Sequence, residues 1–255
     1  MGIVADLPIW MLFLAVGVAL SAGFVKGAVG FGLPLIMISG LAITLPAEIA
    51  LAALILPTVV TNLWQSLRQG LRAAMEAVGK YKLFLTSFLV VIMLSAQLVR
   101  VLPQNVLFIA IGVPIVLLCL VQLRGWSPNL KPENRPRDES VVGAIAGFIG
   151  GISGVWGPPT VAYLTAVNTP KAEQMRVQGV IYGVGAVALV AAHLKSGVFN
   201  SQTAPLSALL LFPAVIGMMI GGRFHDAMPQ ATFKRVTLVI LTVLGLNLIR
   251  KGLMG

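Results

Sequence analysis

The chain has 255 residues, of which 58% are hydrophobic and only 10% are charged, and its formal net charge is +10. An ordinary soluble domain is about half apolar and about a quarter charged, so a mean hydropathy of +0.95 excludes that class. The composition indicates an all-α protein that crosses a lipid bilayer several times. The 18 Lys and Arg residues are spread over short connections between apolar runs, which argues against a nucleic-acid partner.

The first apolar run begins near the amino terminus and leads into GFVKGAVGFGLP, residues 23–34. Asp6 precedes this run and no Lys or Arg does, so we expect a first membrane segment rather than a secretory signal peptide. Four glycines and Pro34 interrupt the run, and Lys26 places a costly charge in it. These residues predict a broken helix.

Long apolar runs and a second broken stretch complete the chain. Residues 124–140 are rich in proline and charge, and they form a linker that is too polar to enter a bilayer. The glycine-rich stretch at 141–168 is too short for two spans and long for one, so two half-helices that meet within the membrane fit best. Six runs have the length of a spanning helix, about 20 residues. They are residues 48–67, 82–102, 105–123, 172–194, 204–222 and 232–249.

The two broken stretches are copies of one another. GFVKGAVG at 23–30 aligns with GFIGGISG at 147–154, and with the later matches nearly the whole chain is two copies of one unit. The further matches are Gly32 with Gly157, Pro34 with Pro159, Ala47 and Glu48 with Ala172 and Glu173, Pro103 and Gln104 with Pro229 and Gln230, and Arg124 with Arg250. We therefore expect a first transmembrane repeat at 1–123, a linker, and a second repeat at 141–255.

The distribution of positive charge predicts that the two repeats are inverted. Basic residues gather in the connection after the first long run, in the linker, and in the connection before the last run, which should all be cytoplasmic. They are Arg68, Arg72, Lys80 and Lys82, then Lys131, Arg135 and Arg137, then Arg223, Lys234 and Arg235. The loop HLKSGVFNSQTAP holds only Lys195 and should face outward. Each repeat is expected to carry a glycine-broken half-helix segment followed by three transmembrane helices.

The paired breaks are the predicted binding site, because non-helical backbone at membrane depth must be buried in protein or line a watery cavity. Helix N-termini and closely approaching glycines favour an anion, and Lys26 adds a full charge that its counterpart Gly150 lacks. Amide and tyrosine side chains can donate to such an anion without a second buried charge. The predicted substrate-binding residues are Lys26, Gly27, Gly30, Gly32, Asn62, Gln65, Ser153, Gly154, Trp156, Gly157, Gln178 and Tyr182.

Each of these positions has a structural alternative. Close helix packing would explain the glycines, interhelical hydrogen bonds would explain the amides, and snorkelling to a membrane interface would explain Lys26. For Arg176 an interfacial anchor is favoured over an anion ligand. Glu48 and Glu173 each begin a run shortly after a proline, where a carboxylate favours a helix N-terminus.

The motifs GFVKGAVGFGLP and GFIGGISGVWGPP resemble the TauE/SafE sulfite exporter family, and the similarity spans essentially the full chain. The resemblance implies a multi-pass carrier in a bacterial cytoplasmic membrane. Its substrate would be a small sulfur-containing oxyanion or organosulfonate, such as sulfite or sulfoacetate, moved by alternating access between inverted halves.

Other functions receive less support from the residues. No nucleotide-binding motif occurs, so we expect no cofactor, and no carboxylate lies in the middle of a run to carry a proton, sodium or a metal ion. His193 and His225 lie near the ends of runs and give little support to an intramembrane enzyme. A passive anion channel stays open as the alternative to a carrier.

Overall fold

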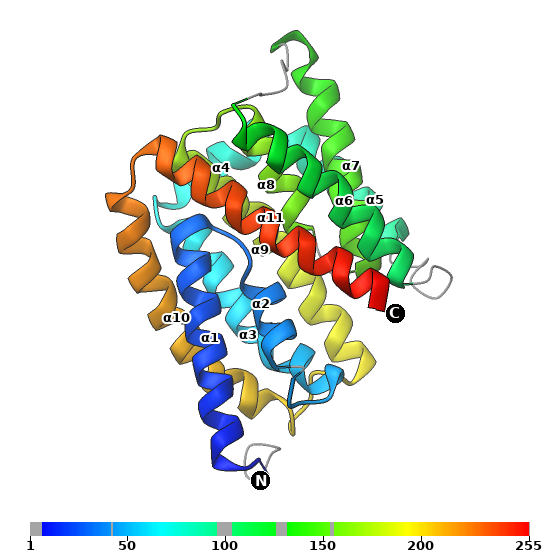
Figure 1. The fold of residues 1–255 in the computed structure, drawn as a ribbon, viewed down its shortest axis with the longest axis vertical. Helices are drawn as coiled ribbons and strands as arrows, with labels where there is room; N and C mark the ends of the chain where they lie inside the picture. The colour runs from blue at the N-terminus through cyan, green and yellow to red at the C-terminus, as the bar shows by residue number, and fades with distance from the viewer. Residues whose placement is uncertain (1–6, 42, 96–103, 126–131, 154–155, 255) are drawn as a thin grey trace. The chain divides into compact units, whose positions relative to one another are not determined.

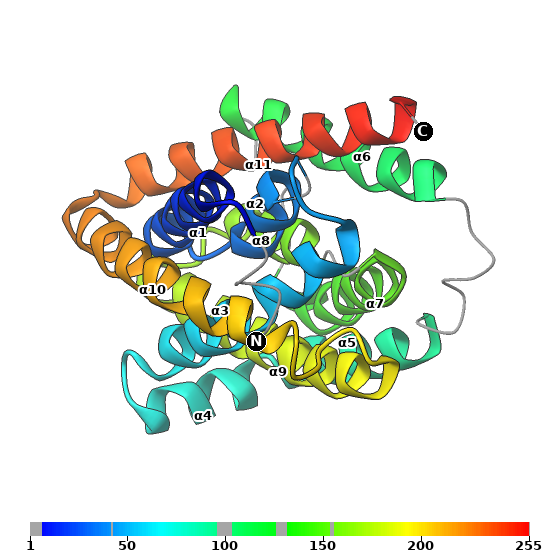
Figure 2. The same ribbon diagram turned by 90° about the horizontal axis from the view of Figure 1, so that it is seen from below.

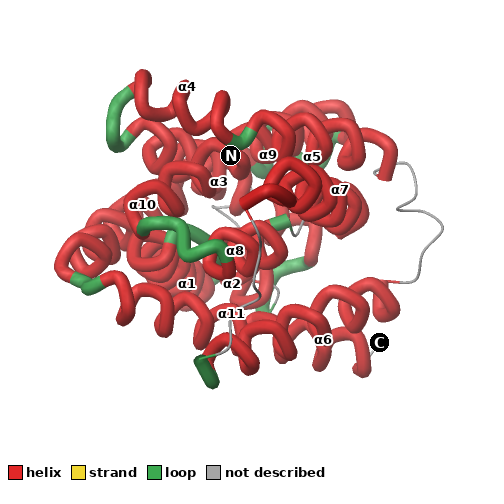
Figure 3. Tube along the Cα trace, turned by 90° about the horizontal axis from the view of Figure 1, so that it is seen from above, coloured by secondary structure: helices red, strands yellow, loops and turns green. Residues whose placement is uncertain are grey.

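The computed structural model describes residues 7–41, 43–95, 104–125, 132–153 and 156–254. Within these ranges the regular elements are helices and no strand occurs, as Figure 3 shows, which confirms the all-α prediction. The helices are labelled in Figure 1. In chain order they are α1 (Ile9–Val29), α2 (Leu33–Leu41), α3 (Ala47–Leu67), α4 (Leu71–Lys80), α5 (Lys82–Ser95), α6 (Gln104–Leu123), the 3-10 turn η3 (Pro132–Asn134), α7 (Arg135–Ser153), α8 (Gly157–Ala166), α9 (Lys171–Ser196), α10 (Ala204–Ala227) and α11 (Gln230–Met254).

The lengths and composition of these helices are those of a membrane protein with several spans. Among the described residues, four helices are long and apolar enough to cross a bilayer by themselves: α1, α3 over Ile49–Leu67, α10 and α11. Helices α4 and α5 pass the same test only as a pair, and they are bent by 77° with respect to each other. The six predicted runs coincide with α3, α5, α6, α9, α10 and α11, although residues 96–102 of the second run lie outside the described residues.

The first glycine break forms as the sequence predicts. Helix α1 ends at Val29, and Gly30 follows in the left-handed region at φ 87°, where its N–H donates to the Lys26 carbonyl over 2.7 Å. Gly32 also has a positive φ, of 94°, and α2 begins directly after it. Pro34 then occupies the first turn of α2, where a missing N–H costs nothing.

The helix before each break and the helix after it differ in length. The helix before each break is long, with 21 residues in α1 and 19 in α7, and the helix after it is short, with 9 residues in α2 and 10 in α8. Helix α7 reaches this length because it begins at Arg135, inside the predicted linker. The Arg135 Nε donates to the Glu139 carboxylate over 2.7 Å, an i,i+4 pair that supports the first turn.

The connection after α3 is also helical, whereas its charges predict a loop. Helix α3 ends at Leu67, and Gly70, at φ 90°, lies in the following turn directly before α4 begins at Leu71. This segment contains alanine, leucine, methionine, glutamate and arginine, all strong helix formers, and charge by itself does not oppose a helix.

The chain divides into two compact units. The first comprises Met1–Ala74 and Gln178–Met228, and therefore holds α1, α2, α3 and α10. The second comprises Met75–Val177 and Pro229–Gly255, and holds α5, α6, α7, α8 and α11. Helices α4 and α9 each belong partly to both. Each unit thus takes helices from both of the predicted repeats.

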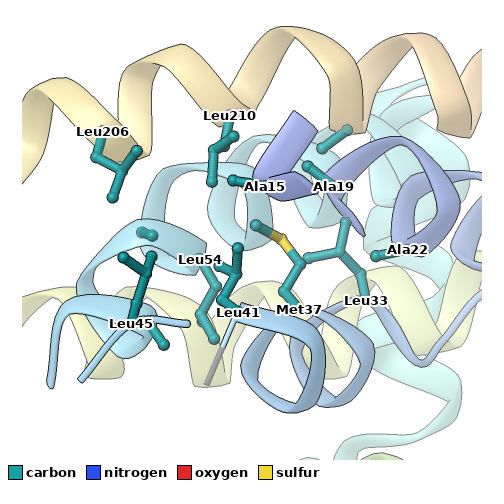
Figure 4. Close-up of a cluster of buried hydrophobic side chains, with 13 residues drawn as sticks. Ala15, Ala19, Ala22, Leu33, Met37, Leu41, Leu45, Leu54, Leu206 and Leu210 are labelled. Carbon is teal, nitrogen blue, oxygen red and sulfur yellow. The ribbon is translucent and has the colours of Figure 1, made fainter. Parts of the chain in front are cut away.

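In the first unit α1 packs closely on α10, because small residues line the contact. Figure 4 shows Ala15 and Ala19 of α1 beside Leu210 of α10, with side chains of α2 and α3 below them. At Gly23 a Cβ atom would lie 2.0 Å from the carbonyl oxygen of Ala214, so the two backbones are in direct contact.

The second unit repeats this contact between other helices. Helix α7 lies beside α5, and a Cβ at Gly147 would lie 2.5 Å from the carbonyl oxygen of Phe88. Gly147 aligns with Gly23 in the predicted repeat, and Phe88 aligns with Ala214 at the spacing of the later matches. The same glycine contact therefore recurs at repeat-related positions. Helix α6 lies along α11 in the same unit (Figure 2), where Gly112 approaches Gly245.

Candidate functional site

Lys26 is buried inside the first unit. It lies in the last turn of α1 with only 2% of its surface exposed. Its Nζ donates a hydrogen bond to Oδ1 of Asn62 over 2.5 Å and lies 5.7 Å from the centre of the Tyr182 ring. A side chain enclosed in this way does not snorkel to a surface of the described chain, so the ammonium group is part of a protein interior.

Asn62, on α3, forms hydrogen bonds with both Lys26 of α1 and the backbone of α9. Its Oδ1 accepts from Lys26, and its Nδ2 donates to the carbonyl oxygen of Tyr182 over 3.1 Å. Because both ends of the amide are engaged, its orientation is fixed and the oxygen faces the ammonium group. Helices α1, α3 and α9 therefore meet at one cluster of Lys26, Asn62 and Tyr182, which we call the lysine cluster.

Gln65 connects the lysine cluster to the first break. It lies three residues after Asn62 on α3, and its Nε2 donates to the carbonyl oxygen of Gly30 over 3.0 Å. That oxygen belongs to the left-handed residue that ends α1, where carbonyl groups lose their intrahelical partners. This hydrogen bond places Gln65 against the backbone of the first break.

Close backbone packing surrounds the lysine cluster. A Cβ at Gly27 would lie 2.2 Å from the carbonyl oxygen of Met218, so the open side of this glycine faces α10. A Cβ at Gly179 would lie 2.5 Å from the backbone nitrogen of Ser66, which brings α9 directly onto α3. Gln178, the residue before Gly179, is completely buried. Close helix packing, the structural alternative for the glycines, therefore explains the side of Gly27 that faces α10.

The electrostatic character of this cluster is positive. Among the described residues, no carboxylate forms an ion pair with Lys26. The carboxylate of Asp226, in the same unit, pairs instead with Arg68 over 2.5 Å at an exposed position. The C-terminal end of α1 supplies a partial negative charge near the ammonium group, which offsets part of the cost of burying it.

Sequence reasoning missed two contacts of α10 in this unit. His225 is buried, and its Nδ1 lies 3.3 Å from the carbonyl oxygen of Ala28 in the last turn of α1. The Arg68–Asp226 ion pair joins the end of α3 to the same turn of α10. A polar residue at the end of an apolar run suggests a membrane interface, so the sequence offered no signal for a buried histidine.

The predicted residues of the second break belong to the other unit. Trp156 is buried at the start of α8, with its ring edge-on to Phe88 at a centroid distance of 6.3 Å. Gly157 begins α8 and is followed by Pro158 and Pro159, so two groups of its first turn have no N–H to offer an anion. Gly154 lies outside the described residues, as does the side chain of Ser153.

A family model described as "Sulfite exporter TauE/SafE" matches residues 14–248 of the chain. The chain matches no curated protein sequence and no solved structure. The family match covers both glycine breaks, the lysine cluster and most of each long helix in the described ranges.

Proposed function

We propose that this chain, which belongs to the sulfite exporter TauE/SafE family of membrane transporters and is not an enzyme, moves a small sulfur-containing oxyanion or organosulfonate. It would carry this substrate across the cytoplasmic membrane by alternating access. The observation that supports the proposal most directly is the burial of Lys26 without a carboxylate partner among the described residues.

A buried cation without a counter-charge is costly, and a bound anion would remove that cost. The ammonium group has three N–H donors, and the structure assigns one of them to Asn62. Two donors are then left for the oxygens of a ligand. A unit charge about 4 Å away would contribute roughly 4 kcal/mol at an effective dielectric constant of about 20. We propose that Asn62 and the Tyr182 ring position the ammonium group while the anion binds and leaves.

Alternating access is supported by the repeats. The glycine contacts of α1 with α10 and of α7 with α5 fall at repeat-related positions, as expected if equivalent helices of the two copies pack in the same way. We propose that 1–123 and 141–255 are repeats of inverted topology on either side of the linker. In such transporters one bundle of helices moves against another around the binding site.

Flux measurements test the transport proposal. Purified protein in liposomes should show saturable counterflow of at least one sulfur oxyanion or sulfonate, with sulfite, thiosulfate, sulfoacetate, isethionate, taurine and sulfate as probes. The reason is that a positive site with no carboxylate selects anions. Ohmic current without counterflow would identify a channel. Saturable uptake of a divalent metal with no response to any of these anions would contradict the anion site.

The topology proposal makes a separate prediction. Asn134 in η3 and Ser201 in the loop before α10 are both exposed, so each can be replaced by cysteine and labelled. The buried Cys119 is first replaced by serine. We expect an impermeant maleimide to label position 134 only from the cytoplasmic side and position 201 only from outside. Labelling of both positions from one side would contradict the inverted repeats.

A further inference from the structure

Helix α4 has an apolar face that no part of the described chain covers. Three large apolar side chains recur on it at the i, i+4, i+7 spacing that places them on one side of a helix. Their exposed fractions are 68% for Leu71, 63% for Met75 and 39% for Val78. The small residues Ala74 and Ala77 face the protein instead and are buried. Large apolar groups are thus turned away from the protein, which is the reverse of a soluble surface helix.

The carboxyl end of α4 is fixed among charged groups. The Lys80 Nζ donates to the Glu173 carboxylate over 2.5 Å, and the Tyr81 hydroxyl donates to the same carboxylate over 3.1 Å. The guanidinium group of Arg135 lies 5.3 Å from the centre of the Tyr81 ring. These residues line an open cavity of about 260 Å³ together with Asp138.

The charged residues around the carboxyl end of α4 determine how deep this helix lies in the membrane. The Glu139 carboxylate, which accepts a hydrogen bond from Arg135, raises the pKa of that guanidinium above its usual value, so the group stays charged. Arg135 and Asp138 lie in the first turn of α7, within the predicted linker, where the density of charged residues is too high for a bilayer interior. The corner at Tyr81 therefore lies at the level of the linker, at the membrane surface. Helix α5 continues from this corner at an angle of 77° to α4.

We infer that α4 is an in-plane interfacial helix that binds the lipid surface on the side of the linker. If α5 crosses the bilayer, a bend of 77° places α4 close to the membrane plane. Leu71, Met75 and Val78 then enter the acyl chains, and the basic side chains beside them meet anionic headgroups.

The charges next to the apolar stripe favour lipid over a protein partner. Arg72 and Lys82 are exposed at either end of the segment, and Lys82 begins α5. Three side chains on one helix make too small a surface for a stable protein interface, which buries on the order of 800 Å² per partner. An acyl-chain layer with anionic headgroups accommodates both the stripe and the exposed Lys82. The inference does not depend on which ion the protein transports.

Fluorescence quenching tests the orientation of α4. A bimane label is placed at Met75→Cys or, as the matched control on the polar side, at Glu76→Cys, both with Cys119→Ser, in liposomes that contain phosphatidylglycerol. We expect brominated acyl chains to quench the label at 75 at least threefold more than the label at 76, and aqueous iodide to show the opposite preference. Equal quenching by iodide at both positions would overturn the inference. Protection of position 75 from both quenchers would also overturn it, because another protein copy would then cover the stripe.

A second measurement tests the headgroup contact. The melting temperature is compared in nanodiscs of phosphatidylcholine alone and of phosphatidylcholine with phosphatidylglycerol. We expect the anionic lipid to raise it for the wild type and for Lys82→Arg, and to raise it less for Lys82→Gln, because only the last variant loses the charge. An undiminished increase in Lys82→Gln would contradict an anionic headgroup at this helix.

Discussion

We expect Lys26→Ala to abolish transport and to leave the protein folded. The substitution removes the positive charge to which the anion would bind. It also relieves the cost of a charge in the membrane, about 2.5 to 3.5 kcal/mol on insertion scales. In exchange, Oδ1 of Asn62 loses its donor, which costs about 1 to 3 kcal/mol for a buried polar atom. These two terms nearly cancel, but the truncated side chain also leaves a cavity, which costs about 2 to 5 kcal/mol at a buried site. The melting temperature should therefore fall while the protein stays folded, and the flux in liposomes should fall to background.

Two further variants separate charge from packing at this position. Lys26→Met keeps an unbranched apolar side chain of similar length and should be as inactive as Lys26→Ala, because the charge alone is missing. Lys26→Arg keeps the charge but replaces a compact ammonium group with a planar fork, and should recover only part of the flux. Wild-type flux in Lys26→Met, at matched protein levels, would show that the buried lysine does not bind the substrate.

The lysine cluster could be predicted because polar residues inside apolar runs must find partners. Lys26, Asn62 and Tyr182 lie on three separate runs, and each is a polar residue within a run that is apolar on average. All three were predicted as substrate-binding residues, whereas the hydrogen bonds among them depend on helix packing that the sequence does not specify. His225 could not be found in this way, because it lies at the end of its run and its partner is a backbone carbonyl.

The helices α4 and α7 show where composition misleads. Charged residues predicted a loop before α5 and a linker through residue 140, yet both segments contain good helix formers and fold as helices. Charged residues indicate that a segment contacts water, but they do not exclude a helix. A helix at the membrane surface contacts water on one side only and can carry its charged residues there. The sequence repeat likewise identified which positions of the two copies correspond, but not which helices pack against each other. That α1 packs on α10 and α7 on α5 depends on contacts between residues far apart in the chain.

The largest effect on stability is expected from Gly23→Ala, which tests the packing of α1 on α10. A Cβ at this position would lie 2.0 Å from the carbonyl oxygen and 3.0 Å from Cα of Ala214. Backbone atoms of a helix cannot move aside as a flexible side chain can, so the two helices must separate. Overpacking typically costs about 1 to 3 kcal/mol, and a clash with backbone should reach the upper end of that range.

Gly17 on the same helix provides the matched control for this variant. A Cβ at Gly17 meets no atom within 4 Å, so Gly17→Ala should keep or raise stability, by up to about 1 kcal/mol from helix propensity. The repeat-related Gly147→Ala should lower stability as Gly23→Ala does, because its Cβ would lie 2.5 Å from the carbonyl oxygen of Phe88. Thermal melts of the four proteins in one detergent measure these differences. If Gly23→Ala has the same melting temperature as Gly17→Ala, helices α1 and α10 are not in backbone contact. If Gly23→Ala lowers the melting temperature and Gly147→Ala does not, the two glycines do not share one structural role.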